Sequence, residues 1–193
     1  MNKRQIQKQF TRDKILDSAK QIFIEKGIIN SATLQIAEKA GIAHGTLFLH
    51  FPNKDALVIG LLDIELLKFS DEIKQLIIET DEIDKLLNQY LNLIKKEEGF
   101  FSSLAREMPS YKSELRRKIL FRESLIREHF HQVIEKGIRK GIYASVDIPS
   151  VLTFLFGTIN YYLSLKSSFV HSGSVIEKFH DQTIEIFMKI LKK

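Results

Sequence analysis

Hydrophobic residues recur along this chain with the spacing of α-helices, and we find no stretch with the strict alternation of a β-strand. The apolar residues from Ile15 to Phe23 fall on one face of a helix. Thr11 can cap the start of this helix, and Gly27 follows its last turn, where glycine is favoured. The pattern predicts an all-α protein of about nine helices, in which three short helices precede longer ones.

The other helix boundaries are set by residues that start or stop helices. Asn53 and Asp147 are expected to cap the starts of two helices, and Pro149 suits the first turn of the second. Gly137 and Gly141 are expected in the loop before that second helix. The helices expected after the first one cover residues 33–39, 44–51, 54–78, 83–99, 100–108, 112–136, 148–169 and 174–191.

Residues 33–51 have the arrangement of a helix-turn-helix, with two short helices joined by a tight turn at Gly41. Ala37 is small where the two helices must cross closely. The residues expected on the exposed face of the second helix are His44, Gly45, Thr46 and Phe48. Small residues at the start of such a helix allow close approach to base edges in the major groove of DNA. From spacing alone, an ordinary helical hairpin with a glycine turn is the alternative.

The surrounding residues make a more specific comparison. Residues 12–27 read RDKILDSAKQIFIEKG, and residues 36–57 read IAEKAGIAHGTLFLHFPNKDAL. These segments resemble the DNA-binding domain of the TetR family of bacterial transcriptional regulators. They share its Ala-Gly turn, the Gly-Thr-Leu start of its recognition helix and its closing Phe. The resemblance implies a homodimeric regulator with a small-molecule effector and a palindromic double-stranded DNA operator.

The resemblance also implies roles for individual residues. It places His44 and Gly45 where the family contacts bases. It implies contacts with the phosphate backbone for Thr33, His50 and Lys54. For Thr46 it implies a contact with either phosphate or base. A solvated surface position is the alternative for Lys54, and a packed ring is the alternative for His50. The chain departs from the family at Phe48, where a phosphate-binding Tyr is usual, and at Ala43, where a capping Ser or Thr is common.

Positive charge is concentrated near the N-terminus. The net charge of the chain is +5, and residues 1–55 hold nine Lys and Arg against five Asp and Glu, a net of +4. A basic arm ahead of a folded segment is typical of nucleic-acid binding, although a solvating tail has the same composition. We expect a DNA-binding domain over residues 1–55 and a helical ligand-binding and dimerisation domain over residues 56–193.

The second domain is expected to provide the dimer interface. The helix expected over residues 148–169 is apolar on nearly all sides, so it must be buried on nearly all sides. The resemblance implies that the last two helices form a four-helix bundle with a second copy, and a large single-chain core is the alternative. The residues expected at the dimer interface are Val151, Leu155, Gly157, Ile176, Phe179, Thr183 and Phe187.

Aromatic residues are dense in this second domain, and some of them can line a cavity for the effector. Because these residues outnumber candidate charged anchors, we expect a small, mainly apolar effector that releases a repressor from DNA. Aromatic residues at helical spacing also suit a plain core, which is the alternative. The candidate pocket residues are Tyr90, Phe100, Phe101, Phe121, His129, Phe154 and Tyr162.

The sequence gives little support to other classes of function. The chain has no cysteine, which excludes disulfides and thiolate chemistry, and its histidines lack the spacing of a metal site. We find no phosphate loop or nucleophile motif, so we expect neither an enzyme nor a cofactor. Residues 151–163, the most apolar run, are too few to span a membrane, and the first residues are too polar for a signal peptide. We therefore expect a soluble, cytoplasmic protein, with a helical protein–protein interaction module as the alternative to a DNA-binding regulator.

Overall fold

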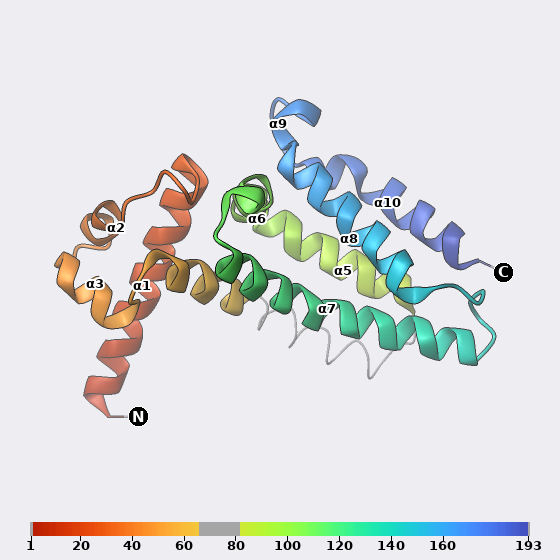
Figure 1. The fold of residues 1–193 in the computed structure, drawn as a ribbon, viewed down its shortest axis with the longest axis horizontal. Helices are drawn as coiled ribbons and strands as arrows, with labels where there is room; N and C mark the ends of the chain where they lie inside the picture. The colour runs from red at the N-terminus through yellow and green to blue at the C-terminus, as the bar shows by residue number, and fades with distance from the viewer. Residues whose placement is uncertain (1, 66–81, 193) are drawn as a thin grey trace.

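The computed structural model describes residues 2–65 and 82–192, and all regular structure in these ranges is helical, as predicted. Figure 1 shows a long helix with short helices beside it at the N-terminal end and a bundle of helices towards the C-terminus, so the prediction that the first helix is short is wrong. The N-terminal elements are α1 (Lys3–Lys26), α2 (Thr33–Lys39) and α3 (His44–His50), followed by helical residues 54–65. The others are α5 (Ile83–Lys96), α6 (Glu98–Glu107), a 3-10 turn η1 (Met108–Ser110), α7 (Ser113–Arg139), α8 (Ile148–Ser164), α9 (Lys166–Phe169) and α10 (Val175–Leu191).

Helix α1 begins well before the predicted start. Asn2 accepts a hydrogen bond from the Gln5 N–H (2.9 Å), and the Gln5 side chain accepts one from the Asn2 N–H (3.0 Å). This reciprocal cap satisfies two backbone donors at the first turn, so the helix starts at Lys3. The prediction that Thr11 caps the helix is wrong, because its hydroxyl lies within the helix and donates to the Gln7 carbonyl (2.9 Å).

Two later helix starts agree with the prediction, but two glycines that were predicted at helix ends do not lie at helix ends. Asn53 and Asp147 accept hydrogen bonds from backbone N–H groups three residues further on, which confirms both as helix caps. Gly99 and Gly137 lie inside helices instead of ending them. At Gly137 the Tyr143 ring occupies the space that a Cβ would need. The helix predicted over residues 54–78 is described only to residue 65, and the rest lies outside the described residues.

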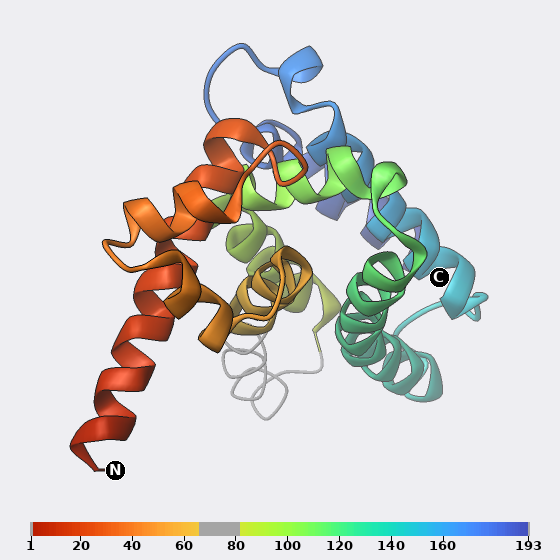
Figure 2. The same ribbon diagram turned by 60° about the vertical axis from the view of Figure 1, so that its left-hand side comes forward.

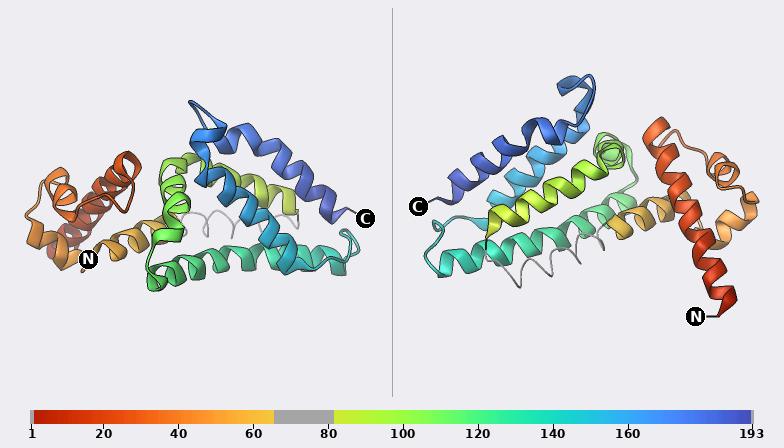
Figure 3. Two further views of the ribbon diagram at one scale, coloured as in Figure 1. Left: turned by 45° about the horizontal axis from the view of Figure 1, so that its top comes forward. Right: turned by 180° about the vertical axis from the view of Figure 1, so that it is seen from behind.

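One hydrophobic core runs through both ends of the molecule. Helix α6 contacts α1 on one side and α8 on the other, and α8 also packs against α7 and α10. Figure 2 shows α6 passing between the N-terminal helices and the C-terminal bundle, and both views in Figure 3 place α8 and α10 side by side. Helix α6 therefore contacts both groups of helices. Within the described ranges, the helices are too short or too polar to cross a lipid bilayer.

Candidate nucleic-acid interface and effector cavity

The helix-turn-helix forms as predicted. Helices α2 and α3 are joined by a turn in which Gly41 has a φ of 63°, a backbone conformation that glycine adopts without strain. The Ile42 N–H donates to the Ala37 carbonyl (3.0 Å), which closes the turn. Ala37 and Leu47 are buried between the helices and fix their crossing.

The start of α3 brings two of the predicted DNA contacts together. The Oγ1 atom of Thr33, at the start of α2, lies 3.0 Å from Nε2 of His44, at the start of α3. The His44 ring also packs against Phe48, with 4.8 Å between ring centroids. The hydrogen bond with Thr33 orients the imidazole and occupies its Nε2 atom. As long as this hydrogen bond is present, the His44 ring can reach a base edge only through Nδ1.

The outer side of α3 has space for DNA. A Cβ added at Gly45 would meet no atom within 4 Å, and Thr46 is half-buried beside it. Phe48 is 42% exposed, and Leu49, which the sequence analysis did not single out, is 82% exposed. Leu49 lies four positions after Gly45, so the two residues share one face of the helix. This spacing is the signal that could have identified Leu49.

A basic groove runs beside this helix. It is lined by residues of the first turns of α1 and the end of α3: Lys3, Arg4, Gln7, Lys8, Thr11, Leu49 and His50. Burial lowers the pKa of His50, and the positive charges of Lys8 and Arg12 lower it further. Burial and the nearby positive charges therefore both disfavour the protonated imidazole. The surface around it is strongly positive, and such a surface attracts phosphate groups.

Lys54 already has protein partners. Its Nζ atom donates to the carbonyl oxygens of Ile29 (2.8 Å) and Ser31 (3.0 Å), in the connection between α1 and α2. Burial lowers the pKa of Lys54, while the negative charges of Glu107 and Asp55 act in the opposite direction. An ammonium group has three donors, so at most one N–H is left for the predicted contact with DNA phosphate.

Helix α6 holds the same connection from the other side. The Glu107 carboxylate accepts hydrogen bonds from the N–H groups of Ile28 (3.2 Å) and Ile29 (2.7 Å), and the Ser103 hydroxyl donates to the Phe23 carbonyl (3.1 Å). Gly27 has a φ of 81°, and a Cβ there would overlap the Glu107 carboxylate. The sequence analysis missed Glu107 because its partners lie nearly eighty residues away along the chain.

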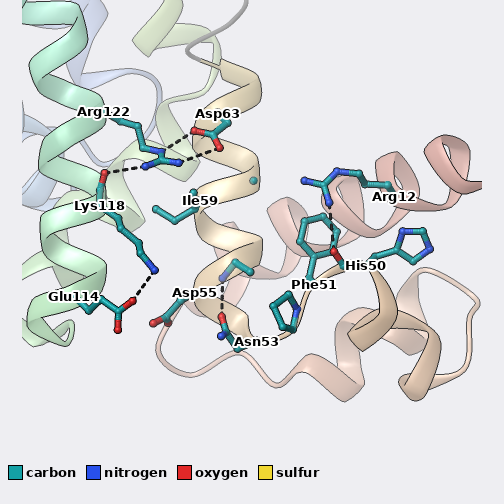
Figure 4. Close-up of a pocket in the computed structure, with 13 residues that line it drawn as sticks. Arg12, His50, Phe51, Asn53, Asp55, Ile59, Asp63, Glu114, Lys118 and Arg122 are labelled. Atoms are coloured by element: carbon teal, nitrogen blue, oxygen red, sulfur yellow. Dashed lines mark hydrogen bonds and ion pairs between the residues drawn. The ribbon is translucent and has the colours of Figure 1, made fainter.

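A polar cleft of about 490 Å³ separates the N-terminal helices from α7 (Figure 4). Across it, Arg122 forms a bidentate ion pair with Asp63, with N···O distances of 2.7 and 3.2 Å. The charged residues that line the cleft are balanced in sign: Arg12, Lys118 and Arg122 against Asp55, Asp63 and Glu114. This balance favours neither an anionic nor a cationic ligand, and the ion pair ties residues 54–65 to α7.

A small cavity of about 60 Å³ lies within the bundle. Its walls are mainly apolar and come from helical residues 54–65, from α5 to α8 and from η1: Leu62, Tyr90, Leu93, Ile94, Phe101, Leu104, Ala105, Met108, Ile119, Glu123, Ile126, Asn160 and Leu163. Polar groups are few: Glu123 pairs with Arg127 (3.0 Å), and the Asn160 amide donates to Glu123 (3.5 Å). Such a site suits an apolar group with one polar end.

Comparison with known proteins decides the family. Residues 15–61 match the sequence profile of bacterial regulatory proteins of the tetR family. The fatty acid metabolism regulator protein of Bacillus subtilis is 25% identical over 154 residues, which cover 76% of this chain and 78% of that protein. The crystal structure of FadR from B. subtilis in complex with stearoyl-CoA has a TM-score of 0.80 at 21% identity, and the match covers 92% of this chain and 98% of FadR. The regulator QacR of Staphylococcus aureus is 23% identical over 192 residues, 94% of this chain and 98% of QacR.

Residues 15–61 of the chain form a DNA-binding domain of the TetR family. The chain is a DNA-binding transcriptional regulator and not an enzyme, and the alternative of an interaction module without DNA binding is not favoured. The match includes both helices of the helix-turn-helix, α2 and α3.

Only two of the predicted pocket residues are among the described residues that line the cavity within the bundle. Tyr90 and Phe101 line the cavity. Phe100 is fully buried in the core, and Tyr162 stacks on Phe179 with 4.3 Å between ring centroids. Phe121 and Phe154 are more than half exposed on helix surfaces, and His129 is half-buried on α7. None of these three is among the described residues that line this cavity. Spacing identified the helices, but it did not separate core, cavity and surface.

The predicted dimer residues also divide into two sets. Five of them lie inside the core of the single chain, so they cannot form the outer face: Val151, Leu155, Ile176, Thr183 and Phe187. Phe179 is half-buried against Tyr162, and only Gly157 lies fully on the exposed side of α8. Phe154, Tyr161 and Leu165 share that side, and Ile186 is exposed on α10. A face this apolar is a candidate contact for a second copy.

Proposed function

We propose that this regulator is a cytoplasmic homodimeric repressor that a long-chain fatty acyl thioester releases from a palindromic operator. Residues 1–55 form the DNA-binding domain, and residues 56–193 bind the effector and the second copy. Small-molecule release of this kind is what the family resemblance implies. The observation that supports this proposal most directly is that α6 both lines the apolar cavity and holds the connection between α1 and α2.

The size of the cavity supports coupling between the two sites. Ligand pockets of proteins typically enclose about 300–1,000 Å³, and the cavity in the bundle encloses about 60 Å³. An acyl chain can therefore enter only if the surrounding helices move apart. Phe101 and Leu104 of α6 form part of the wall, and Glu107 of the same helix bonds to Ile28 and Ile29. A ligand that displaces α6 favours a conformation in which the helix-turn-helix is no longer held in place.

The chemical class of the effector is supported by the lining and by the relatives. The apolar walls suit an alkyl chain, and the cluster of Glu123, Arg127 and Asn160 at one side suits a polar end group. FadR, which shares the fold, is described in complex with stearoyl-CoA. We therefore choose stearoyl-CoA as the first probe and free coenzyme A as its control.

The test measures binding of the purified protein to DNA upstream of its own gene. We expect stearoyl-CoA to raise the melting temperature and to weaken DNA binding, and we expect coenzyme A alone to do neither. Because the chain has no Trp, circular dichroism is the suitable probe of unfolding. Stabilisation by stearoyl-CoA with unchanged DNA affinity would contradict release by the effector.

A substitution at Ala105 should separate effector binding from DNA binding. Ala105 lines the cavity from α6, so Ala105→Phe adds a ring where the acyl chain is expected. Overpacking costs about 1–3 kcal/mol, so we expect about tenfold more stearoyl-CoA to be needed for release, and operator affinity without effector shows whether the ring itself displaces α6. Calorimetric titration with stearoyl-CoA measures the change. An unaltered effector affinity would show that the acyl chain binds elsewhere.

Gly157 tests the dimer. A side chain there meets no atom of its own chain, so Gly157→Arg should leave the protomer folded and place an unpaired charge in the interface. We expect the dissociation constant of the dimer to rise by about tenfold or more, as measured by sedimentation. Gln132→Arg adds the same charge at an exposed position of α7 and serves as the control. A monomeric wild type at micromolar concentration would rule out the proposed homodimer.

A further inference from the structure

The exposed face of the recognition helix α3 is apolar. Gly45, Phe48 and Leu49 lie together at helical spacing, and Leu49 is 82% exposed, whereas Leu47 of the same helix is fully buried. A single exposed leucine is ordinary on a protein surface. Here, however, the leucine continues a face that also carries an exposed phenylalanine, on the helix for which the TetR-family resemblance implies contact with DNA bases.

Hydrogen-bonding groups are scarce on this face. Arginine, asparagine and glutamine are the residues that read base edges most often, and the sequence of α3, HGTLFLH, contains none of them. His44 has its Nε2 atom engaged by Thr33 at 3.0 Å, and Thr46 is half-buried. The helix therefore has few means of reading a base by hydrogen bonds, and its most exposed groups are hydrocarbon.

The surroundings of Leu49 indicate which partner covers it. Leu49 lines the basic groove together with Lys3, Arg4 and Lys8 of α1. Cationic side chains on the rim of an apolar face match phosphate groups on either side of a groove, and they do not match an apolar protein surface. The apolar group that the major groove of DNA offers is the C5-methyl group of thymine.

We propose that Leu49, together with Phe48, reads the C5-methyl groups of thymines in the operator. The proposal deepens the DNA-binding function and rests on it. Gly45 has no side chain that would hold the helix away from the bases, and a Cβ at that position would meet nothing in the protein. Close approach brings the Leu49 side chain to the methyl edge, where contact removes apolar surface of both groups from water.

The experiment uses DNA that the full-length protein itself selects from a random double-stranded library of about three helical turns. Each thymine of the selected site is then replaced singly by deoxyuridine, which lacks only the methyl group. Burial of one carbon contributes about 0.8 kcal/mol, so at one or two positions of each half-site we expect about fourfold weaker binding. In Leu49→Ala, we expect thymine and deoxyuridine to bind equally at the position that Leu49 contacts.

Leu125→Ala is the matched control, because Leu125 is a similarly exposed leucine on α7. It should keep the fourfold preference for thymine, as measured by fluorescence anisotropy with labelled DNA. Equal affinity of the wild type for thymine and deoxyuridine at every position would overturn the proposal, and so would a preference that survives in both Leu49→Ala and Phe48→Ala. A protein that selects no sequence at all would refute sequence-specific binding as well as methyl reading, so the two failures are distinguishable.

Discussion

Glu98→Gln should lower the free energy of unfolding by about 1–3 kcal/mol, the cost of leaving a buried hydrogen-bond donor without its partner. Glu98 is only 4% exposed, at the start of α6. Its carboxylate accepts hydrogen bonds from Ser174 Oγ and from the N–H groups of Val175 (3.1 Å) and Ile176 (3.2 Å), and Lys166 Nζ lies 2.8 Å away. An amide would direct N–H groups at these donors, so the first turn of α10 would lose its anionic cap.

The buried Glu98 carboxylate should also make the stability of the protein depend on pH. Burial acts to raise the pKa of Glu98, but the hydrogen bonds from Lys166, Ser174, Val175 and Ile176 outweigh it, and the pKa lies below its usual range. A carboxylate with a lowered pKa in the folded state contributes stability above its unfolded pKa of about 4.3 and loses it as the pH falls through the folded value. The difference between wild type and Glu98→Gln should therefore shrink in acid.

Urea unfolding at neutral and acid pH measures both effects. Glu114→Gln is the control, because Glu114 also pairs with a lysine, Lys118 at 2.7 Å, but on the exposed surface of α7. An exposed ion pair contributes little to stability, so this variant should unfold near the wild-type midpoint. A Glu98→Gln protein as stable as Glu114→Gln at neutral pH would show that the buried carboxylate does not hold α10.

How much of this molecule the sequence predicts depends on the range of the interactions involved. Local signals identify the turn at Gly41, the caps at Asn53 and Asp147, and the short helices α2 and α3. Each of these features is decided by residues within one or two turns of the chain. The early start of α1 is also a local feature, and Asn2 with Gln5 is the signal for it that was overlooked.

The sites between helices depend on contacts that no local pattern encodes. Tyr90 and Phe121 are both aromatic residues on amphipathic helices, yet one lines the cavity and the other lies on the surface. Leu155 and Phe154 are neighbours on α8, and only the packing of α8 on its partners places the first inside and the second outside. Glu98 and Glu107 belong to one helix and bond to segments more than seventy residues away in opposite directions along the chain.

These two glutamates give α6 a mechanical role. The helix has ten residues and is therefore about 14 Å long. At one end Glu98 holds the start of α10, and at the other Glu107 holds the connection before α2. Between them, Phe101 and Leu104 face the cavity. A displacement of α6 at the cavity therefore reaches the helix-turn-helix through the Glu107 carboxylate.

Glu107→Gln should consequently reduce the response to effector more than it reduces DNA binding. The carboxylate accepts two backbone N–H bonds, and an amide of the same shape can accept only through its single oxygen. Lys54 still holds the same connection through the carbonyls of Ile29 and Ser31, so the helix-turn-helix should stay folded. Coupling energies between sites are typically about 1–3 kcal/mol, which corresponds to a 5–150-fold change in affinity. In Glu107→Gln we expect most of the effector's influence on operator affinity to be lost.

The measurement is operator affinity with and without saturating stearoyl-CoA, for wild type and for two variants. Glu25→Gln is the control, because Glu25 pairs with Lys39 at 3.3 Å on the exposed surface of the N-terminal helices. We expect a large ratio for wild type and Glu25→Gln and a ratio near one for Glu107→Gln, since the ligand would still move α6 but would no longer pull on Ile28 and Ile29. A wild-type ratio in Glu107→Gln would mean that the signal passes through another contact, and the Arg122–Asp63 ion pair between α7 and residues 54–65 would be the next to test.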